Sequence, residues 1–239
     1  MVFERRAYTF RPGKIGAFWQ AQEDWNTPQV YGVVLDNNLS YFSTIAGPSE
    51  QVIQLYRFDS LDHWRACYDT YYTTQKPDYF ALVRPMMQRQ ENGFFIAPPV
   101  AELAAHLTAT PPTLPQAVAA AASKDAANLC VVETALDLFP GGLPAYWEAC
   151  CKHNVAAHPI DTPHRVAMLF TLIGRIHRII QYRAFATLAA AQAHQEALAA
   201  DPAWRAFVSD HSSWVARSQT LFLKPAPWPR MRTLWGRGG

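Results

Sequence analysis

The sequence predicts an α+β protein made of two tandem ferredoxin-like units of order βαββαβ, which close into one intrachain α+β barrel. Two observations carry this prediction. The stretch "PGKIGAFWQA" (12–21) returns as "PGGLPAYWEA" (140–149), 128 residues further along. Within each copy, the hydrophobic pattern alternates between strand and helix spacing. A repeat of this length indicates one supersecondary unit used twice.

The rest of the chain repeats in the same order. "IQLYRFDSL" (53–61) matches "RIIQYRAFATL" (178–188), and "KPDYFALV" (76–83) matches "DPAWRAFV" (201–208). The closing "FFIAPP" matches "LFLKPAP". The spacing drifts by only a few residues, so we interpret the copies as two structural units rather than as a chance match.

The elements of the first copy follow from local patterns. β-rich residues ending at a Pro-Gly turn predict a strand over 3–10, and apolar residues at helical spacing follow it. The turn "GPSE" separates two strands, and Asp59 or Ser60 is placed to cap the next helix. In order, we expect a strand at 3–10, a helix at 15–26, strands at 41–47 and 51–58, a helix at 59–72, a short helix at 77–87 and a strand at 92–97.

The second copy repeats this order. The predicted elements are a helix with Leu143, Tyr146, Trp147, Cys150 and Cys151 on one face, strands at 165–173 and 175–185, helices at 187–200 and 202–218, and a strand at 219–224. The chain thus divides into a first unit (1–99), a Pro/Ala-rich linker (100–127), a second unit (128–228) and a basic C-terminal tail (229–239). A ferredoxin-like sheet leaves one face bare, so we expect the two bare faces to cover each other.

Composition narrows the possible partners. The 239 residues carry a formal charge of only +2, and positive charge gathers at the C-terminal "PRMRTLWGRGG". We therefore expect no nucleic-acid partner. No apolar run is long enough to predict a membrane span, and the N-terminus has no apolar leader, so a cytoplasmic location is the expectation. The four cysteines show no metal-binding spacing, and we expect free thiols.

Several segments resemble the NIPSNAP family. They are "YTFRPGK", "STIAGPSEQVIQLYRFDSLDHWRA", "LAADPAWRAFV" and "LKPAPWPRM", and the resemblance covers nearly all of the chain except the linker and tail. It implies two tandem NIPSNAP domains of the dimeric α+β barrel group. That group includes cofactor-free oxygenases, haem-handling enzymes, cyclases and small-molecule sensors. The matching segments are fold markers and imply no catalytic residue.

The first strand supplies one candidate site. Alternation places Glu4, Arg6, Tyr8 and Phe10 on one face. If that face looks into the barrel, Glu4 and Arg6 bind the polar head of a ligand and Tyr8 is a catalytic candidate. The alternative is a Glu4–Arg6 ion pair with Tyr8 in the core.

Histidines supply a second candidate. His153, His158 and His164 lie within the segment "CCKHNVAAHPIDTPHR", where a proton-transfer, metal or haem role competes with ordinary loop histidines. His153 and His158 are taken as catalytic candidates, and Arg165, where the next strand begins, as a ligand-binding residue.

A polar row supplies a third candidate. Arg175, His177, Ile179, Gln181 and Arg183 share one strand face, which indicates a wet cavity or a solvent-facing edge. His177 is the catalytic candidate of this row.

Aromatic residues supply the pocket walls. Trp19, Tyr41, Tyr56 and Trp147 are expected to shape a ligand pocket. Each copy carries a tryptophan followed by an asparagine, namely Trp19 and Asn26 in the first and Trp147 and Asn154 in the second. Over a sheet, such a pair is similar to residues of haem-degrading barrels. Because both copies carry it, helix packing with an Asn end cap is the simpler explanation.

Two classes of function remain. The first is binding, and transformation by acid–base chemistry, of a small apolar or aromatic metabolite in the barrel cavity, as a cofactor-free oxygenase, isomerase or cyclase. No organic cofactor is expected, while haem or a metal stays open. The second is a non-catalytic interaction or assembly protein. We expect a homo-oligomer in either case. No known catalytic signature is present.

Overall fold

Within the residues that the structure describes, the first unit of the protein holds four strands and four α-helices. The computed structural model describes residues 1–25, 28–74, 77–108, 118–119 and 126–235. The elements are β1 (Val2–Phe10), α1 (Ile15–Asp24), α2 (Pro28–Leu35), β2 (Asn38–Ala46), β3 (Gln51–Phe58), α3 (Leu61–Thr74), α4 (Pro77–Val83), the 3₁₀ turn η1 (Arg84–Met86) and β4 (Met87–Ile96).

The second unit repeats this order after a connecting segment. The connection contains α5 (Ala101–Thr108) and η2 (Ala126–Asn128). The unit itself contains β5 (Cys130–Leu138), α7 (Gly142–Lys152), η3 (Val155–Ala157), β6 (Arg165–Ile173), β7 (Arg178–Phe185), α8 (Leu188–Ala200), α9 (Pro202–Ser212) and β8 (Val215–Pro225), followed by η4 (Pro229–Met231).

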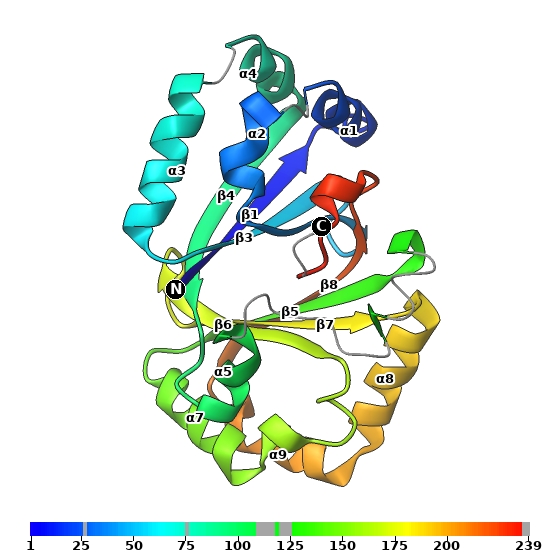
Figure 1. Ribbon diagram of the computed structural model, residues 1–239. Coiled ribbons are helices and arrows are strands. Elements are labelled where there is room, and N and C mark those ends of the chain that lie inside the picture. Colours follow the sequence, from blue (N-terminus) through cyan, green and yellow to red (C-terminus); the bar gives the residue numbers. More distant parts are fainter. Residues whose placement is uncertain (26–27, 75–76, 109–117, 120–125, 236–239) are drawn as a thin grey trace.

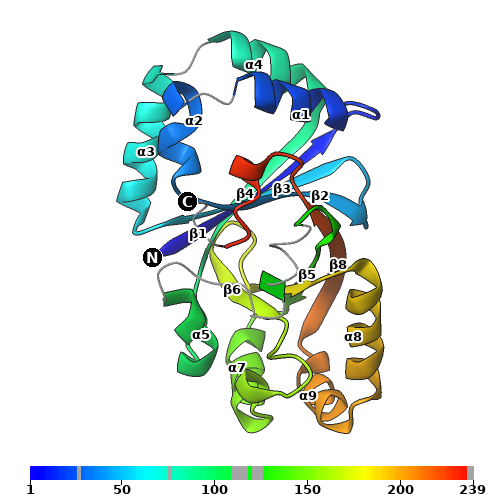
Figure 2. The same ribbon diagram turned by 45° about the vertical axis from the view of Figure 1, so that its right-hand side comes forward.

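The strands close into one antiparallel barrel of order β1-β3-β2-β8-β5-β7-β6-β4. Two seams join the units: β2 pairs with β8, where Phe42 lies opposite Pro225, and β4 pairs with β6, where Phe95 lies opposite Thr171. The helices of each unit cover only its own half, so the barrel lies between two helical layers (Figures 1 and 2). The predicted fold of two ferredoxin-like units in an intrachain barrel is confirmed.

Local sequence signals explain several element ends. Gly141, at the start of α7, has a φ of 89°, a conformation that glycine adopts without steric cost. Thr187 caps α8 by accepting a hydrogen bond from the amide of Ala190 (3.1 Å). Asp201 caps α9 in the same way, from the amide of Trp204 (2.7 Å). The strands β4 and β8 begin earlier than expected, at Met87 and Val215, because the helices before them stop sooner.

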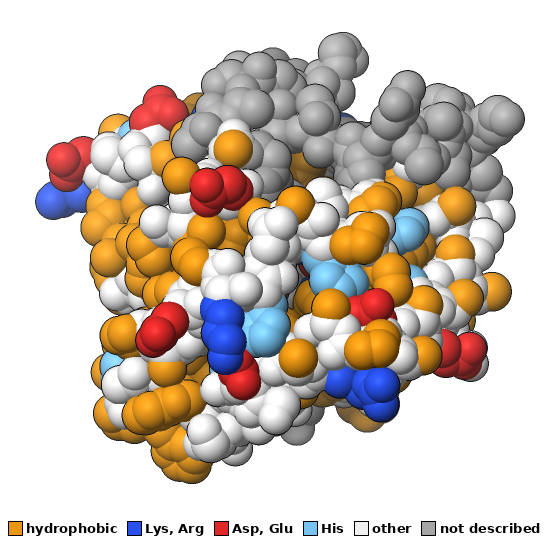
Figure 3. Space-filling view, turned by 90° about the horizontal axis from the view of Figure 1, so that it is seen from below, with side chains coloured by type: hydrophobic (Ala, Val, Ile, Leu, Met, Phe, Trp, Pro, Cys, Tyr) orange, Lys and Arg blue, Asp and Glu red, His pale blue; other side chains and the backbone are white. Residues whose placement is uncertain are grey.

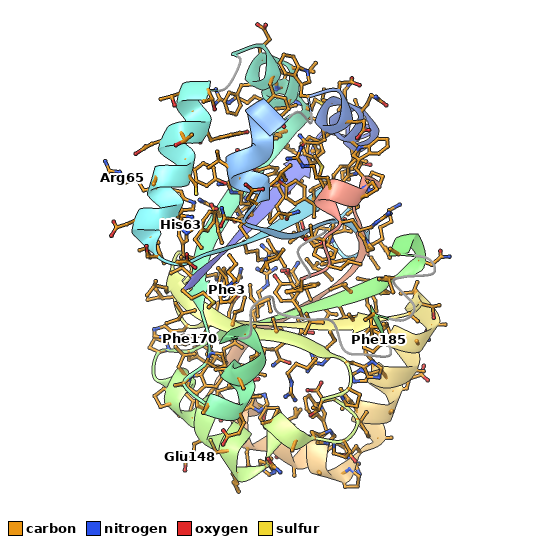
Figure 4. The ribbon with its side chains drawn as sticks, in the orientation of Figure 1. Phe3, His63, Arg65, Glu148, Phe170 and Phe185 are labelled. Carbon is orange, nitrogen blue, oxygen red and sulfur yellow. The ribbon has the colours of Figure 1, made fainter. Side chains whose placement is uncertain are left out.

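The barrel interior is a packed core rather than a cavity. Apolar side chains from all around the barrel fill it, and only a void of about 10 Å³ remains. Phe3 and Ala7 of β1 belong to this core, and Figure 4 shows Phe3 between the two sheets. The face of β1 that carries Glu4, Arg6, Tyr8 and Phe10 therefore does not look into the barrel, and the alternative with a Glu4–Arg6 ion pair applies. Tyr8 and Phe10 pack with the helix layer, because the other side of β1 fills the barrel.

The C-terminal segment closes part of the barrel. Met231, Leu234 and Trp235 are buried, and the Trp235 ring contacts those of Phe42 and Tyr182. The prediction of a loose tail from residue 229 is thus wrong up to Trp235; residues 236–239 lie outside the described part. Within the described residues, none of the helices is long and apolar enough to span a membrane.

Candidate functional site

In each unit open space lies between the sheet and the helices, whereas the middle of the barrel is filled. The first unit has a cavity of about 90 Å³ and the second a pocket of about 870 Å³. The predicted ligand residues Arg6, Tyr41 and Tyr56 and the catalytic candidate Tyr8 come together around the smaller cavity. The expected ligand space therefore exists, but on the opposite side of each sheet from the barrel axis.

Arg6 is the charged centre of the small cavity. Its Nε and Nη2 donate to the two carboxylate oxygens of Glu4 at 2.9 and 3.1 Å, and its Nη1 donates to the Tyr8 hydroxyl at 3.3 Å. Glu4 is completely buried and also accepts a hydrogen bond from the Trp64 indole (3.0 Å). The guanidinium lies 4.5 Å from the centre of the Tyr68 ring. This is the ion pair of the alternative interpretation, so Glu4 already balances the charge of Arg6.

Tyrosines form most of the cavity wall. The Tyr41 and Tyr56 hydroxyls share a hydrogen bond, and Tyr56 donates to Gln54 at 3.0 Å. Burial raises the pKa of Tyr8, Tyr56 and Tyr68, so each is a neutral phenol near pH 7. A neutral phenol donates a hydrogen bond but is a poor base. The arrangement suits Tyr8 to orienting a ligand by a hydrogen bond.

The large pocket of the second unit has mostly apolar walls. The sheet supplies its floor, and α8 and α9 supply its sides; Figure 4 shows Phe185 on the α8 side of β7. Among its lining residues are Val132, Thr134, Leu136, Tyr146, Gln181, Arg183, Phe185, His194, Leu198, Trp204, Phe207 and His211. Its volume lies in the range of small-molecule sites, roughly 300–1,000 Å³.

A chain of buried polar groups crosses the floor of this pocket. Arg183 donates from Nε to Asp161 and from Nη2 to Gln181 (2.5 Å), and Gln181 donates to the Tyr146 hydroxyl (2.5 Å). Arg165 binds the same Asp161, with Nε at 3.0 Å. Burial alone would raise the pKa of Asp161, but the two arginines lower it, so it stays ionised. Arg165 and Arg183 share the single carboxylate of Asp161, so one positive charge at the floor of the pocket is not balanced.

The polar row of residues 175–183 was expected to face either a wet cavity or solvent at a sheet edge, and the structure contains the cavity. Gln181 and Arg183 are buried and line the pocket, while β7 pairs with β5 and β6 on its two sides. Arg175 and His177 lie before the strand, in the turn that leads into it. Arg165 sits behind Asp161 and does not line the pocket.

His211 is the best-placed base in the large pocket. Its Nδ1 lies 2.7 Å from the carbonyl oxygen of Phe207, and a carbonyl only accepts, so Nδ1 carries the proton. Burial lowers the pKa of His211, which keeps the ring neutral near pH 7. Nε2 is then the basic nitrogen. This ring contacts the Tyr146 ring edge-on, with centroids 4.9 Å apart.

His194 is a second neutral imidazole of the same pocket. Burial, and then the nearby Arg183, lower its pKa to about 4. Its Nε2 is buried without a hydrogen-bond partner, and its ring packs against Phe185 and His164. Several histidine side chains are visible near the middle of the face seen from below, on the side of α7, α8 and α9 (Figure 3).

The three predicted catalytic histidines lie elsewhere. His153 contacts Asp210 (2.7 Å) and His158 contacts Asp201 (3.1 Å), while His177 sits in the β6–β7 turn with a φ of 62°. None of the three lines the cavity of Arg6 and Tyr8. That cavity belongs to the first unit, and these histidines belong to the second, across the barrel.

Two predicted aromatic residues pack beside the pockets rather than lining them. The Trp19 indole donates to the Ser43 hydroxyl (3.1 Å). The Trp147 ring packs edge-on against Tyr146 and Phe170. Asn26 lies outside the described residues, so the Trp19–Asn26 pairing has no structural counterpart here. Among the described residues, no group of three or more His, Cys, Asp or Glu side chains could hold a metal ion. All four cysteines are free.

His194 and His211 were missed because nothing in their local sequence distinguishes them. His211 lies in the helix predicted at 202–218, for which the hydrophobic pattern was not used to predict a buried face. A helical-wheel argument could have found it, since His211 lies four residues after Phe207 and on the same face.

Solved structures with the same fold span nearly the whole chain. An anthrone oxidase-like protein is 12% identical, with 94% of this chain and 90% of that chain covered and a TM-score of 0.60. A putative monooxygenase from Fusobacterium nucleatum is 9% identical, with 94% and 92% covered and a TM-score of 0.57. At these identities the likeness shows the fold alone. No curated protein matches.

Family comparison identifies both units. A NIPSNAP family protein of unknown function from Agrobacterium tumefaciens is 25% identical over 44% of this chain and 96% of its own length, with a TM-score of 0.38. The NIPSNAP sequence profile matches residues 3–101 and 135–230, one segment in each unit. The chain therefore belongs to the NIPSNAP family.

Proposed function

We propose that this protein binds a small, largely aromatic molecule in the pocket of the second unit and transforms it by acid–base chemistry. The carrying observation is that a neutral imidazole, His211, and an incompletely balanced guanidinium, Arg183, line one apolar pocket of about 870 Å³. Apolar walls with a few polar groups are typical of small-molecule sites.

The pocket is suited to removing a proton and holding the resulting anion. Nε2 of His211 takes a proton from a phenol or from an activated C–H group of the ligand. Arg183 and the Tyr146 hydroxyl then stabilise the charge on the ligand oxygen, as donors fixed in place by Asp161 and Gln181. Proton removal of this kind begins cofactor-free oxygenation, isomerisation and cyclisation alike.

Oxygenation is the reaction to test first, because fold neighbours are described as a monooxygenase and as anthrone oxidase-like. The balanced reaction is the conversion of an activated methylene group and O₂ into a carbonyl group and water. Proton removal by His211 leaves a carbanion on the ligand. This carbanion supplies the electrons that reduce O₂, so no external reductant is required. An anthrone fits the chemistry of the pocket, since it is planar, apolar and acidic at one carbon.

The test measures oxygen uptake and quinone absorbance with a panel of anthrones. His211→Gln should lower turnover by roughly 10²–10⁴-fold, because a general base contributes about that much. His153→Gln is the matched control, because its ring bonds a surface carboxylate and lines neither pocket. Full activity in the His211 variant would contradict the proposal. His158→Gln, His177→Gln and Tyr8→Phe test, in the same assay, the roles predicted for those residues.

Haem binding is a second candidate, and the two neutral imidazoles of one pocket are the observation that favours it. A Soret band in natively purified protein, lost in a His194→Ala or His211→Ala variant, would support it. Homo-oligomerisation and a cytoplasmic location stay predictions, for gel filtration with light scattering and for fractionation to test.

A further inference from the structure

The barrel is filled along its axis but opens at one end into a cup of about 660 Å³. The cup is lined by inward-facing residues of strands on opposite sides. Thr9 of β1 lies beside Arg89 of β4, and Gln219 and Arg217 of β8 face in from across the barrel. β4 and β8 are four strands apart in either direction around the eight-stranded barrel. Arg89 and Arg217 are therefore contributed by opposite walls.

The cup holds more positive than negative charge. Five arginines line it: Arg5, Arg89, Arg175, Arg178 and Arg217. Three carboxylates pair with them, namely Glu133 with Arg5, Glu91 with Arg89, and Asp137 with both Arg175 and Arg178. Five cations against three anions leave an excess of two positive charges. The whole chain has a formal charge of only +2, so this end of the barrel carries as much excess as the entire protein.

The excess gathers on one wall of the cup, around Asp137, which lies opposite Arg217 of β8 on one side and Arg178 of β7 on the other. Arg217 is exposed and has no hydrogen-bond or ion-pair partner among the described residues. Arg175 and Arg178 share one carboxylate, Asp137, at 3.3 and 2.6 Å. Guanidinium groups in such positions bind the oxygens of phosphate or carboxylate groups in pairs. Three guanidinium groups around the single carboxylate of Asp137 suit a ligand with two negative groups better than a single anion.

The rest of the lining limits the ligand further. Gln51 and Gln219 add amide groups at the wall, and Ala7, Phe95 and Leu221 form an apolar floor. The Arg5–Glu133 pair beneath is internally neutral, with Nη2 to Oε1 at 2.7 Å. The cup is also separate from the pocket of the second unit. Ser218 of β8 lines that pocket, while its neighbours Arg217 and Gln219 line the cup on the other side of the strand.

We infer that this cup is a binding site for a small soluble polyanion. The ligand carries at least two negative groups, phosphate or carboxylate, that contact Arg217 and the Arg175–Arg178 pair. Its organic part contacts the apolar floor. The inference does not depend on the chemistry of the other pocket.

Calorimetric titration of the full chain at low ionic strength tests this, with inorganic pyrophosphate and citrate as probes. We expect one site per chain, weakened by added NaCl, and the tighter of the two probes assigns phosphate or carboxylate. Arg217→Gln should raise the dissociation constant about 10- to 100-fold, the value of one charge-assisted hydrogen bond. Arg65→Gln is the control, since Arg65 points away from the barrel on α3.

The inference is overturned if neither probe binds at millimolar concentration, or if Arg217→Gln and Arg65→Gln bind alike. Because Arg217 is exposed and unpartnered, its variant should unfold at the same temperature as the wild type, which keeps the comparison interpretable. Anionic vesicles and a short oligonucleotide are titrated in parallel. Binding of either one through Arg217, with no binding of pyrophosphate or citrate, would also overturn a small-ligand site.

Discussion

In the part of the chain that the structure describes, one ion pair crosses the barrel, at its pseudo-twofold axis. Arg5 of β1 and Glu133 of β5 occupy equivalent positions in the two units, and they bond each other by Nε–Oε2 at 2.9 Å and Nη2–Oε1 at 2.7 Å. The Glu133 side chain is only 2% exposed and that of Arg5 is 14% exposed. Tyr182 also donates to Glu133, at 2.8 Å. The pair therefore joins opposite walls of the barrel through largely buried side chains.

Removing one partner should be costly. Arg5→Met leaves a buried carboxylate with only the Tyr182 hydroxyl, and the expected loss is about 3–5 kcal/mol in the free energy of unfolding. At about 2–4 °C per kcal/mol for a chain of this size, the melting temperature should fall by roughly 6–20 °C. Glu133→Leu should cost a similar amount, because it leaves a buried guanidinium.

The double variant separates a lost contact from an unpaired charge. Arg5→Met with Glu133→Leu removes both charges and keeps an apolar core, so its stability should return to within about 1–2 kcal/mol of the wild type. Urea unfolding followed by circular dichroism measures all three variants. Arg65→Met, at an exposed pair with Asp69, is the control and should change stability by less than about 1 kcal/mol. Single variants that cost under about 1 kcal/mol, or losses that simply add in the double variant, would refute the reasoning.

Two further predictions concern the second unit and the C-terminal segment. His194 has a folded-state pKa of about 4, below its ordinary value, so the stability it contributes is present above about pH 6.5 and is lost as the pH falls toward 4. His194→Gln should flatten that loss by about 1–3 kcal/mol in urea titrations at pH 7, 5.5 and 4, and an unchanged slope would contradict it. Trp235→Ala should lower the unfolding free energy by about 3–5 kcal/mol, because it empties a buried site beside Phe42 and Tyr182. A change below about 1 kcal/mol would show that this segment does not support the barrel.

The fold was predictable because a repeated sequence indicates a repeated structural unit, with the same order of helices and strands. Each copy preserves the order of strands, turns and caps even where single residues differ, so the βαββαβ order survives local errors. The direction in which a strand faces was not predictable in the same way. β1 is covered by helices on one side and by the opposite sheet on the other, so polar and apolar residues occur on both faces. Alternation then shows which residues share a face but not which face is inside.

The clustering of arginines at one end of the barrel was not predictable from the sequence, for a related reason. The sequence shows basic residues together only near its end, whereas the arginines of the cup come from Arg5, Arg89, Arg178 and Arg217, far apart in the chain. Only barrel closure brings them to one mouth. The same applies to the large pocket, where Arg183 was recognised through its strand row, while His211 joined it from a different element.

Comparison of equivalent positions explains why one unit has a filled cavity and the other an open pocket. The register pairs Val2 with Phe58 in one unit and Cys130 with Phe185 in the other, which aligns the elements of the two units. Tyrosines at positions 8, 56, 68 and 71 of the first unit then correspond to Leu136, Arg183, Gln195 and Leu198 of the second. Four aromatic rings have been exchanged for side chains that leave the space above the sheet free. Above this part of the sheet, about 90 Å³ is free in the first unit and about 870 Å³ at the equivalent place in the second. Because both sheets must still close one barrel, this divergence is confined to the helix-facing sides, and there the second unit can hold a ligand while the tyrosine-packed first unit supports the barrel.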